Sequence, residues 1–404
     1  MESDMDPNIT ADEIALYDRQ IRLWGVQGQT QLRSASILLI TAKAIANEVA
    51  KNLVLAGIGS LTIIDHEPVT QHDIDSSFFL AAAFTEDESI VVKGKNRAEV
   101  AAPPIRRMNP RVKLSIDTSD VRLKDPTFFA QFDMIIATDL EFTANTTINA
   151  ACRVANRPFY AAGLHGMYGF VFADLISHDF VIERQKSNFS PSPQETQTRS
   201  IVSITRKKQG KNTIELVTKR ETYSPLILAN TSPLPKEFTS VARRRKQVTP
   251  LISCLRALWE FEKTSEGHKP PSSAEDIARF TELAVKSHRE LNLEMENLSS
   301  VFIRKFLQNL GLEVSPVAAF LGGYLAQDAI NVITNREQPL QNMLLFDGET
   351  SIGPIYPLHP FFPSPGVMTI PIHTSAASAA IETAANSIVP AAVAASAQES
   401  ITLD

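Results

Sequence analysis

The chain has 404 residues, 44% hydrophobic and 21% charged, a composition typical of a globular protein with two or three domains. Its formal net charge of −6 gives no indication of a nucleic-acid partner, and no uninterrupted apolar run approaches the length of a membrane span. Neither of the two cysteines stands in a C-x-x-C pair, which excludes a cysteine-based zinc site and a disulfide framework and favours the nucleus or the cytoplasm.

Strands and helices are predicted to alternate along the first part of the chain. An opening helix is expected at residues 11–23. Buried strands are expected at residues 36–40, 61–65, 134–138 and 159–162, and a further strand, antiparallel to its neighbour, at residues 169–175. Helices are expected at residues 44–55 and 148–156. This alternation predicts a doubly wound, mainly parallel, Rossmann-like α/β sheet.

The pattern changes after residue 177 and returns near residue 311. Residues 185–200 are polar and predict a flexible loop, residues 201–224 hold short alternating segments, and residues 235–310 have helical periodicity. A helix is expected at residues 316–334, where Gly322 and Gly323 permit close packing, and a strand at residues 342–347. The domain prediction is therefore an α/β domain at 11–177 and 311–360, an inserted loop and helical subdomain at 178–310, and a disordered tail at 361–404.

The loop after the strand at residues 36–40 lacks the glycines of a phosphate-binding loop. A nucleotide-binding βαβ unit usually carries G-x-G-x-x-G at this place, whereas this chain has TAKAIA at residues 41–46. Glycine lets the backbone turn tightly and approach a phosphate, and the side chains of Thr41, Ala42, Ala44 and Ala46 obstruct that approach. The sequence therefore predicts the scaffold of a nucleotide enzyme without its working loop.

An ordered set of motifs then indicates a family. YDRQIRLWG (17–25), KNLVLAGIGSLTIIDHEPVT (51–70), GKNRAE (94–99), MNPRV (108–112), SPVAAFLGGYLAQDAINVI (315–333) and NMLLFDG (342–348) follow one another along the chain. Together they resemble the adenylation domain of ubiquitin-like-modifier activating enzymes and their bacterial sulfur-carrier adenylyltransferase relatives. In length and in its single adenylation-like domain, the chain is most similar to the smaller, non-catalytic subunits of SUMO-activating enzymes.

The resemblance implies a heterodimer in which the partner does the chemistry. The partner subunit would bind ATP and Mg, adenylate the C-terminus of SUMO, take SUMO onto its catalytic cysteine and pass it to a conjugating enzyme. No cofactor, metal, nucleic acid or membrane is expected to bind this chain.

Departures from the active members of the family support that division. Where active members carry an Asn and an Arg after the second strand, this chain has Asp73, expected to repel a triphosphate, and Ser76, which lacks a guanidinium's charge. The Lys of a later motif is Arg97 here, a milder change. Asp65, at the ribose-binding position, and Asp139, at the magnesium-binding position, are interpreted as relics or structural residues rather than working ligands.

Arg19 is the one candidate catalytic residue. In active relatives the Arg of this N-terminal motif reaches into the partner's ATP site, where a charge supplied in trans stabilises adenylate formation. The alternative is a surface ion pair with Asp18 or Glu13. Arg22 is a weaker candidate and is interpreted as structural.

The other reactive side chains receive structural interpretations. Cys152 and Cys254 lie in apolar helical stretches and are expected in the core, and His165 is expected to be a structural loop residue. The basic run at residues 243–246 fits either a nuclear import signal or a solvated helix face.

Four other functions are alternatives from the residues. The chain could be the regulatory subunit of a Nedd-type activating enzyme, although such subunits are usually longer, or a purely structural scaffold. An autonomous homodimeric adenylyltransferase and a nicotinamide-dependent oxidoreductase both need the missing glycines.

Overall fold

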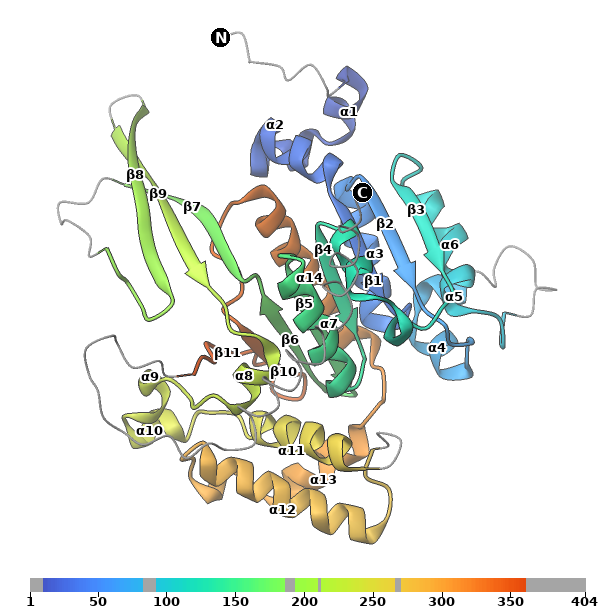
Figure 1. The fold of residues 1–404 in the computed structure, drawn as a ribbon, viewed down its shortest axis with the longest axis vertical. Helices are drawn as coiled ribbons and strands as arrows, with labels where there is room; N and C mark the ends of the chain where they lie inside the picture. The colour runs from blue at the N-terminus through green and yellow to red at the C-terminus, as the bar shows by residue number, and fades with distance from the viewer. Residues whose placement is uncertain (1–9, 83–91, 186–192, 210–211, 266–269, 361–404) are drawn as a thin grey trace, which may run out of the picture. The chain divides into compact units, whose positions relative to one another are not determined.

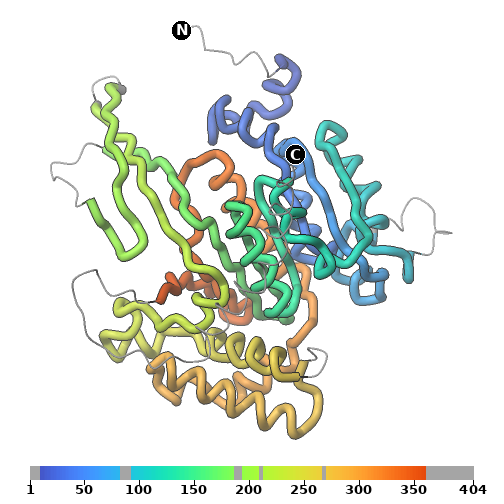
Figure 2. The backbone as a smooth tube through the Cα atoms, viewed as in Figure 1, coloured from blue at the N-terminus to red at the C-terminus, as the bar shows by residue number. Residues whose placement is uncertain are grey.

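The computed structural model describes residues 10–82, 92–185, 193–209, 212–265 and 270–360. Within these ranges the chain forms an eight-stranded sheet, a three-stranded sheet and the helices around them (Figures 1 and 2). The tail predicted to be disordered, at 361–404, lies outside the described residues.

The eight-stranded sheet has the order β11-β10-β6-β5-β4-β1-β2-β3. Its parallel strands are β1 (Ser36–Ile40), β2 (Ser60–Ile64), β3 (Lys113–Asp117), β4 (Met134–Thr138) and β5 (Phe159–His165). The antiparallel extension consists of β6 (Tyr168–Asp174), β10 (Met343–Asp347) and β11 (Ile355–Tyr356). The mainly parallel, doubly wound sheet is confirmed, and β6 runs antiparallel as predicted.

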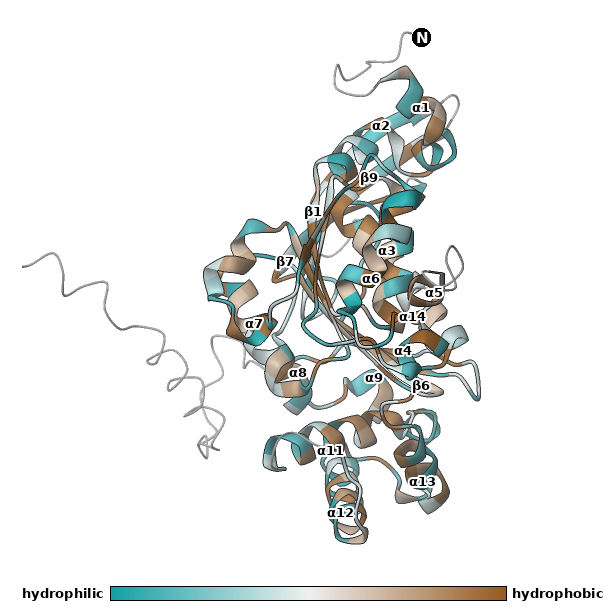
Figure 3. Cartoon of the chain, turned by 90° about the vertical axis from the view of Figure 1, so that its right-hand side faces the viewer, coloured by the Kyte–Doolittle hydropathy of each residue, from teal (hydrophilic) through white to brown (hydrophobic). Residues whose placement is uncertain are grey.

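Helices cover both faces of this sheet (Figure 3). The first face carries α3 (Ala44–Ala56), α6 (Arg97–Met108) and α14 (Ser315–Thr334); the second carries α7 (Phe142–Val154), with α8 (Leu226–Thr231) and α11 (Leu251–Thr264) packed beside it. Alternate residues of β1 point to opposite faces of the sheet, each of which has its own hydrophobic core. Ile37 and Leu39 pack in the core of the first face, and Leu38 and Ile40 pack in the core of the second. Farther along the second core lie α12 (Ala274–Glu290) and α13 (Ser300–Asn309).

α14 is the one helix in the described ranges whose length and composition would suit a membrane span. It is packed as a core helix, since Val317, Leu321, Leu325 and Ala329 are buried in the layer that it shares with α3. Its apolar character is therefore accounted for by packing inside the protein.

The N-terminal region departs from the prediction of one helix at residues 11–23. It forms α1 (Ala11–Leu16) and α2 (Asp18–Ser34), with Tyr17 between them. The Tyr17 side chain is buried, and its hydroxyl accepts a hydrogen bond from Asn109 Nδ2 at 2.8 Å. This tertiary contact explains why Tyr17 leaves helical geometry. α2 also continues well beyond residue 23, past a kink at Gly25.

The segment after residue 177 departs further. It forms β7 (Ser177–Gln185), β8 (Arg199–Gln209) and β9 (Asn212–Thr222), an antiparallel sheet in the order β7-β9-β8, where the sequence indicated a loop and short alternating pieces. Partly buried ion pairs, such as that of Arg199 Nε with Glu221 Oε2 at 2.5 Å, join β8 to β9 where the hydrophobic pattern is weak. The helical prediction for residues 235–310 is met by α11, α12, α13 and the short helices α9 (Lys236–Thr239) and α10 (Ala242–Arg245).

Short elements that the sequence did not indicate lie between β2 and β4. They are α4 (Gln71–Ser76), α5 (Phe78–Ala82), α6 and β3, together with the 3-10 turns at Val121–Leu123 and Pro126–Gln131. A further 3-10 turn, Met295–Asn297, precedes α13.

Candidate functional site

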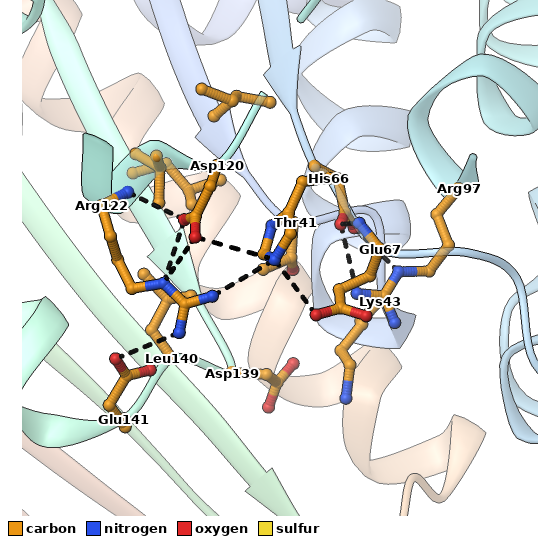
Figure 4. A pocket seen from close by; sticks show the side chains of 14 residues that line it. Thr41, Lys43, His66, Glu67, Arg97, Asp120, Arg122, Asp139, Leu140 and Glu141 are labelled. Carbon is orange, nitrogen blue, oxygen red and sulfur yellow. Dashed lines mark hydrogen bonds and ion pairs between the residues drawn. The ribbon is translucent and has the colours of Figure 1, made fainter. Parts of the chain in front are cut away.

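A pocket of about 320 Å³ opens at the carboxyl ends of β1, β2 and β4 (Figure 4). β1 has β2 on one side and β4 on the other, so this is the switch point at which open α/β sheets bind ligands. Its polar wall consists of Thr41, Lys43, Asp65, His66, Glu67, Arg97, Asp120, Arg122, Asp139 and Glu141. Among the positions singled out from sequence, Ala42, Ala44, Ala46, Asp73 and Ser76 lie outside this wall.

The loop between β1 and α3 uses its backbone N–H groups within the chain. The Thr41 N–H donates to the carbonyl of Ile64 at 3.0 Å, and the Ala42 N–H donates to Asp65 Oδ2 at 2.9 Å. The side chains of Ala42, Ala44 and Ala46 are buried in the core. A phosphate cradle needs backbone N–H groups that face the ligand. At these two positions the N–H groups are already engaged.

Thr41 stands in a backbone conformation that favours glycine. Its φ is +72°, which is strained for a β-branched residue. The Thr41 hydroxyl lies 2.7 Å from the hydroxyl of Thr138, which itself donates to the carbonyl of Ile40 at 3.1 Å. The loop therefore keeps the turn of a glycine-rich loop, and a buried hydrogen bond between two threonines holds it there.

Arg97 joins two buried carboxylates beside the loop. Its Nε lies 2.8 Å from Asp65 Oδ2 and its Nη2 lies 3.2 Å from Asp65 Oδ1, while Nη1 reaches Asp73 Oδ1 at 3.2 Å. Asp73 also caps α4, because its Oδ2 accepts from the Thr70 N–H at 2.7 Å. Asp73 is 2% exposed and ion-paired with Arg97, which it shares with Asp65, and the expected repulsion of a triphosphate stays a prediction. From the sequence, Arg97 was interpreted only as a mild replacement of lysine, and its pairing with Asp65 and Asp73 was not predicted.

The carboxylate of Glu313, from the segment before α14, lies at the N-terminus of α3. Its Oε2 accepts from the Ala44 N–H at 3.3 Å and lies 2.7 Å from the Ser76 hydroxyl, and its Oε1 lies 3.3 Å from Lys43 Nζ. A helix N-terminus favours an anion, so a side chain of this chain takes the position that suits a phosphate. Sequence reasoning missed Glu313, which stands just outside the motif that begins at Ser315.

Asp139 is a poor candidate for holding magnesium. Its Oδ1 accepts from the Leu164 N–H at 2.9 Å, and its buried Oδ2 has no hydrogen-bond partner among the described residues. Burial and the negative charge of Glu313 raise the pKa of Asp139 to about 7, against the opposing charge of Lys43. A carboxyl that is half protonated near neutrality is a weak ligand for a hard cation. No cluster of three possible metal-ligating side chains occurs in the described ranges.

Arg19 lies near the other end of α3. It is exposed on the first turn of α2 and has no ion-pair or hydrogen-bond partner within the part of the chain that the structure describes. The alternative pairings expected from sequence do not occur, because Asp18 pairs with Arg22 at 2.8 Å and Glu13 pairs with Arg33 at 3.3 Å. The neighbouring Gln20 donates to the carbonyl of Leu55, in the last turn of α3.

Cys152 in α7 and Cys254 in α11 are buried as the sequence predicts, whereas His165, expected in a loop, is the last residue of β5. Cys152 and Cys254 are fully buried, and burial raises the pKa of both thiols, so the reactive thiolate is disfavoured. Burial also lowers the pKa of His165 to about 4, and its ring packs against Phe306. These three residues are structural.

The basic run at residues 243–246 lies in and directly after α10. Its side chains reach solvent, and two of them form ion pairs, Arg245 with Glu294 at 3.1 Å and Lys246 with Glu296 at 3.7 Å. This matches the expected solvated helix face. The import signal stays a prediction.

Comparison with known proteins gives the family. Residues 17–363 match the ThiF family. The chain is 35% identical over 355 residues to DNA damage tolerance protein RHC31 of Saccharomyces cerevisiae, which covers 86% of this chain and 97% of that protein. It is 31% identical over 347 residues to SUMO-activating enzyme subunit 1 of Xenopus laevis (85% and 95% covered) and 30% identical over 355 residues to that of Homo sapiens (87% and 97%). The chain therefore belongs to the ThiF family, in the group that contains SUMO-activating enzyme subunit 1.

Proposed function

We propose that this chain is the non-catalytic subunit of a heterodimeric SUMO-activating enzyme. Its partner binds ATP and Mg, adenylates the C-terminus of SUMO, carries it as a thioester on a cysteine and delivers it to a conjugating enzyme. Relatives that cover most of the chain are named as subunits of a SUMO-activating enzyme, which supports this assignment. This chain contributes structure and one cation, and it carries out no adenylation by itself.

The proposal is supported chiefly by the contacts that the loop at residues 41–46 and its neighbours make within the chain. The Thr41 and Ala42 N–H groups bind the chain itself, Asp65 is bound on both carboxylate oxygens by Arg97, and Glu313 lies at the N-terminus of α3. A triphosphate would have to displace each of these contacts. The isolated chain is therefore expected to leave ATP chemistry to the partner.

Arg19 is proposed to act in the partner's ATP site. α3 has 13 residues and so rises about 20 Å between its two ends. Because α2 contacts the C-terminal end of α3, Arg19 lies far from this chain's own pocket, which opens at the N-terminal end. An exposed guanidinium without a partner in the described chain suits delivery to another molecule's phosphates.

ATP–pyrophosphate exchange tests both parts of the proposal. Exchange is expected from the mixed subunits and not from this chain alone, and robust exchange by this chain alone would favour an autonomous adenylyltransferase. In the mixture, Arg19→Ala is expected to slow exchange at least about tenfold with the heterodimer intact. Arg22→Ala, a change of a neighbouring exposed arginine, is the matched control and is expected to leave the rate unchanged. Equal rates for the two variants would indicate that this chain acts only as a structural scaffold.

A further inference from the structure

The site around Glu313 carries an inference that does not depend on the proposed function. We propose that Glu313 is an internal counter-anion that fills a phosphate-type site of this chain and fastens the segment before α14 to the α/β core. Without that carboxylate, the site would accept a small phosphate anion such as inorganic pyrophosphate.

The site is built by three donors from two separate parts of the chain. Lys43 precedes α3 and supplies its ammonium, and Ala44 begins that helix and supplies its N–H. Ser76 ends α4 and supplies its hydroxyl, whose single proton is shared between Glu313 at 2.7 Å and the carbonyl of His72 at 2.8 Å. All three converge on one carboxylate whose side chain is 8% exposed. Charge-assisted hydrogen bonds of this kind suit phosphate oxygens as well as they suit a carboxylate.

The charges around Lys43 leave a place for an anion when Glu313 is removed. Besides Glu313, the charged groups that act on Lys43 are Asp139, which attracts it, and Arg97, which repels it. Arg97 is already bound to Asp65 and Asp73. Removing Glu313 takes away one of the charges that raise the pKa of Asp139, but burial, the larger cause, still opposes the ionisation of that carboxyl beside Lys43. Lys43 and the helix N-terminus would then be left with little negative charge to balance them.

Two further hydrogen bonds, one on each side of Glu313, anchor the segment between α13 and α14. The Gly166 N–H donates to the carbonyl of Leu312 at 2.7 Å, and the Ser315 hydroxyl donates to the carbonyl of Ser76 at 3.2 Å. Glu313 lies between these two anchors with its side chain directed at α3. Because α13 ends at Asn309, the anchored segment fixes the point where the helical region rejoins the core.

Calorimetric titration of the full chain with pyrophosphate tests the inference. Glu313→Ala is expected to bind pyrophosphate at least about tenfold more tightly than the wild type, and Lys43→Met added to Glu313→Ala is expected to abolish the gain. Glu349→Ala is the control, because Glu349 also pairs with a lysine, Lys305 at 2.7 Å, but far from the site in the sequence and at the surface.

Amide hydrogen exchange gives a second readout of the same variants. Residues 310–316 are expected to exchange faster in Glu313→Ala than in the wild type or in Glu349→Ala. If Glu313→Ala does not fold, the titration and the hydrogen exchange are measured on Glu313→Gln, which keeps the size of the side chain and removes its charge. A folded variant with wild-type pyrophosphate affinity and wild-type exchange at 310–316 would overturn the inference.

Discussion

Arg97 stabilises the residues at the base of the pocket, because its guanidinium pairs with two carboxylates that are almost completely buried. Arg97→Met would leave Asp65 and Asp73 without a countercharge and is expected to lower the free energy of unfolding by about 3–5 kcal/mol. Guanidinium chloride unfolding measures this change.

The control for this prediction is an ion pair at the surface. Arg220 binds Asp179 with short contacts, and both side chains are well exposed, so Arg220→Ala is expected to cost less than about 1 kcal/mol. Similar losses for the two variants would show that the buried cluster does not stabilise the fold.

Asp139 makes stability depend on pH. Its folded-state pKa is about 7 and its unfolded value about 4, so the folded state holds the proton more tightly between these values and the wild type loses stability as the pH rises through them. Asp139→Asn has no such loss. The stability of this variant relative to the wild type is expected to increase by up to about 3–4 kcal/mol between pH 4 and pH 8. Urea unfolding at several pH values measures the difference, and a pH-independent difference would contradict the assignment.

At the scale of single residues, the sequence indicates which functional groups are missing and not what replaces them. The absence of glycine at residues 41–46 is visible directly. The hydrogen bond between Thr41 and Thr138 and the contact of Glu313 with Ala44 join residues far apart in the chain, with no periodic pattern between them. Such contacts depend on the folded arrangement of β1, β4 and α14.

Two adjacent glycines of α14 differ in their packing. A Cβ added at Gly322 would lie 2.5 Å from Glu48 Cβ and 3.0 Å from the carbonyl oxygen of Ile45, so Gly322→Ala forces α14 away from α3 and is expected to cost about 1–3 kcal/mol. At Gly323 an added Cβ meets nothing within 4 Å among the described neighbours, and Gly323→Ala is expected to stabilise the protein by about 0.5–1 kcal/mol. Thermal unfolding of both variants measures the contrast. Equal effects would show that the closeness of α3 and α14 does not matter.

Among the elements, hydrophobic periodicity predicts the parallel strands and the long helices well. β1 and β4 are buried on both faces and read as continuous apolar runs, and the core helices repeat apolar residues at helical spacing. The sheet of β7, β8 and β9 is missed because its apolar alternation is weak and partly buried ion pairs, such as Arg199 with Glu221, join its strands. The break at Tyr17 is missed because it depends on Asn109, distant in the chain.

In the whole molecule, the two ends of α3 lie beside different features. The N-terminal end of α3 carries a nucleotide pocket whose loop is bound to the chain itself, and the C-terminal end lies beside the helix that carries Arg19. On the proposed function, such a subunit would give up catalysis in its own pocket and present a cation to a partner. The order of the motifs predicts this division, and the contacts in the pocket support it.

Equilibrium binding of ATP and Mg to the full-length chain, measured without a partner, shows whether its own pocket holds a nucleotide. Calorimetry is expected to detect no binding at millimolar ATP, while the partner subunit under the same conditions binds it. Saturable binding to this chain in the micromolar range, with β- and γ-phosphates seated at Ala42 and Ala44, would contradict the account.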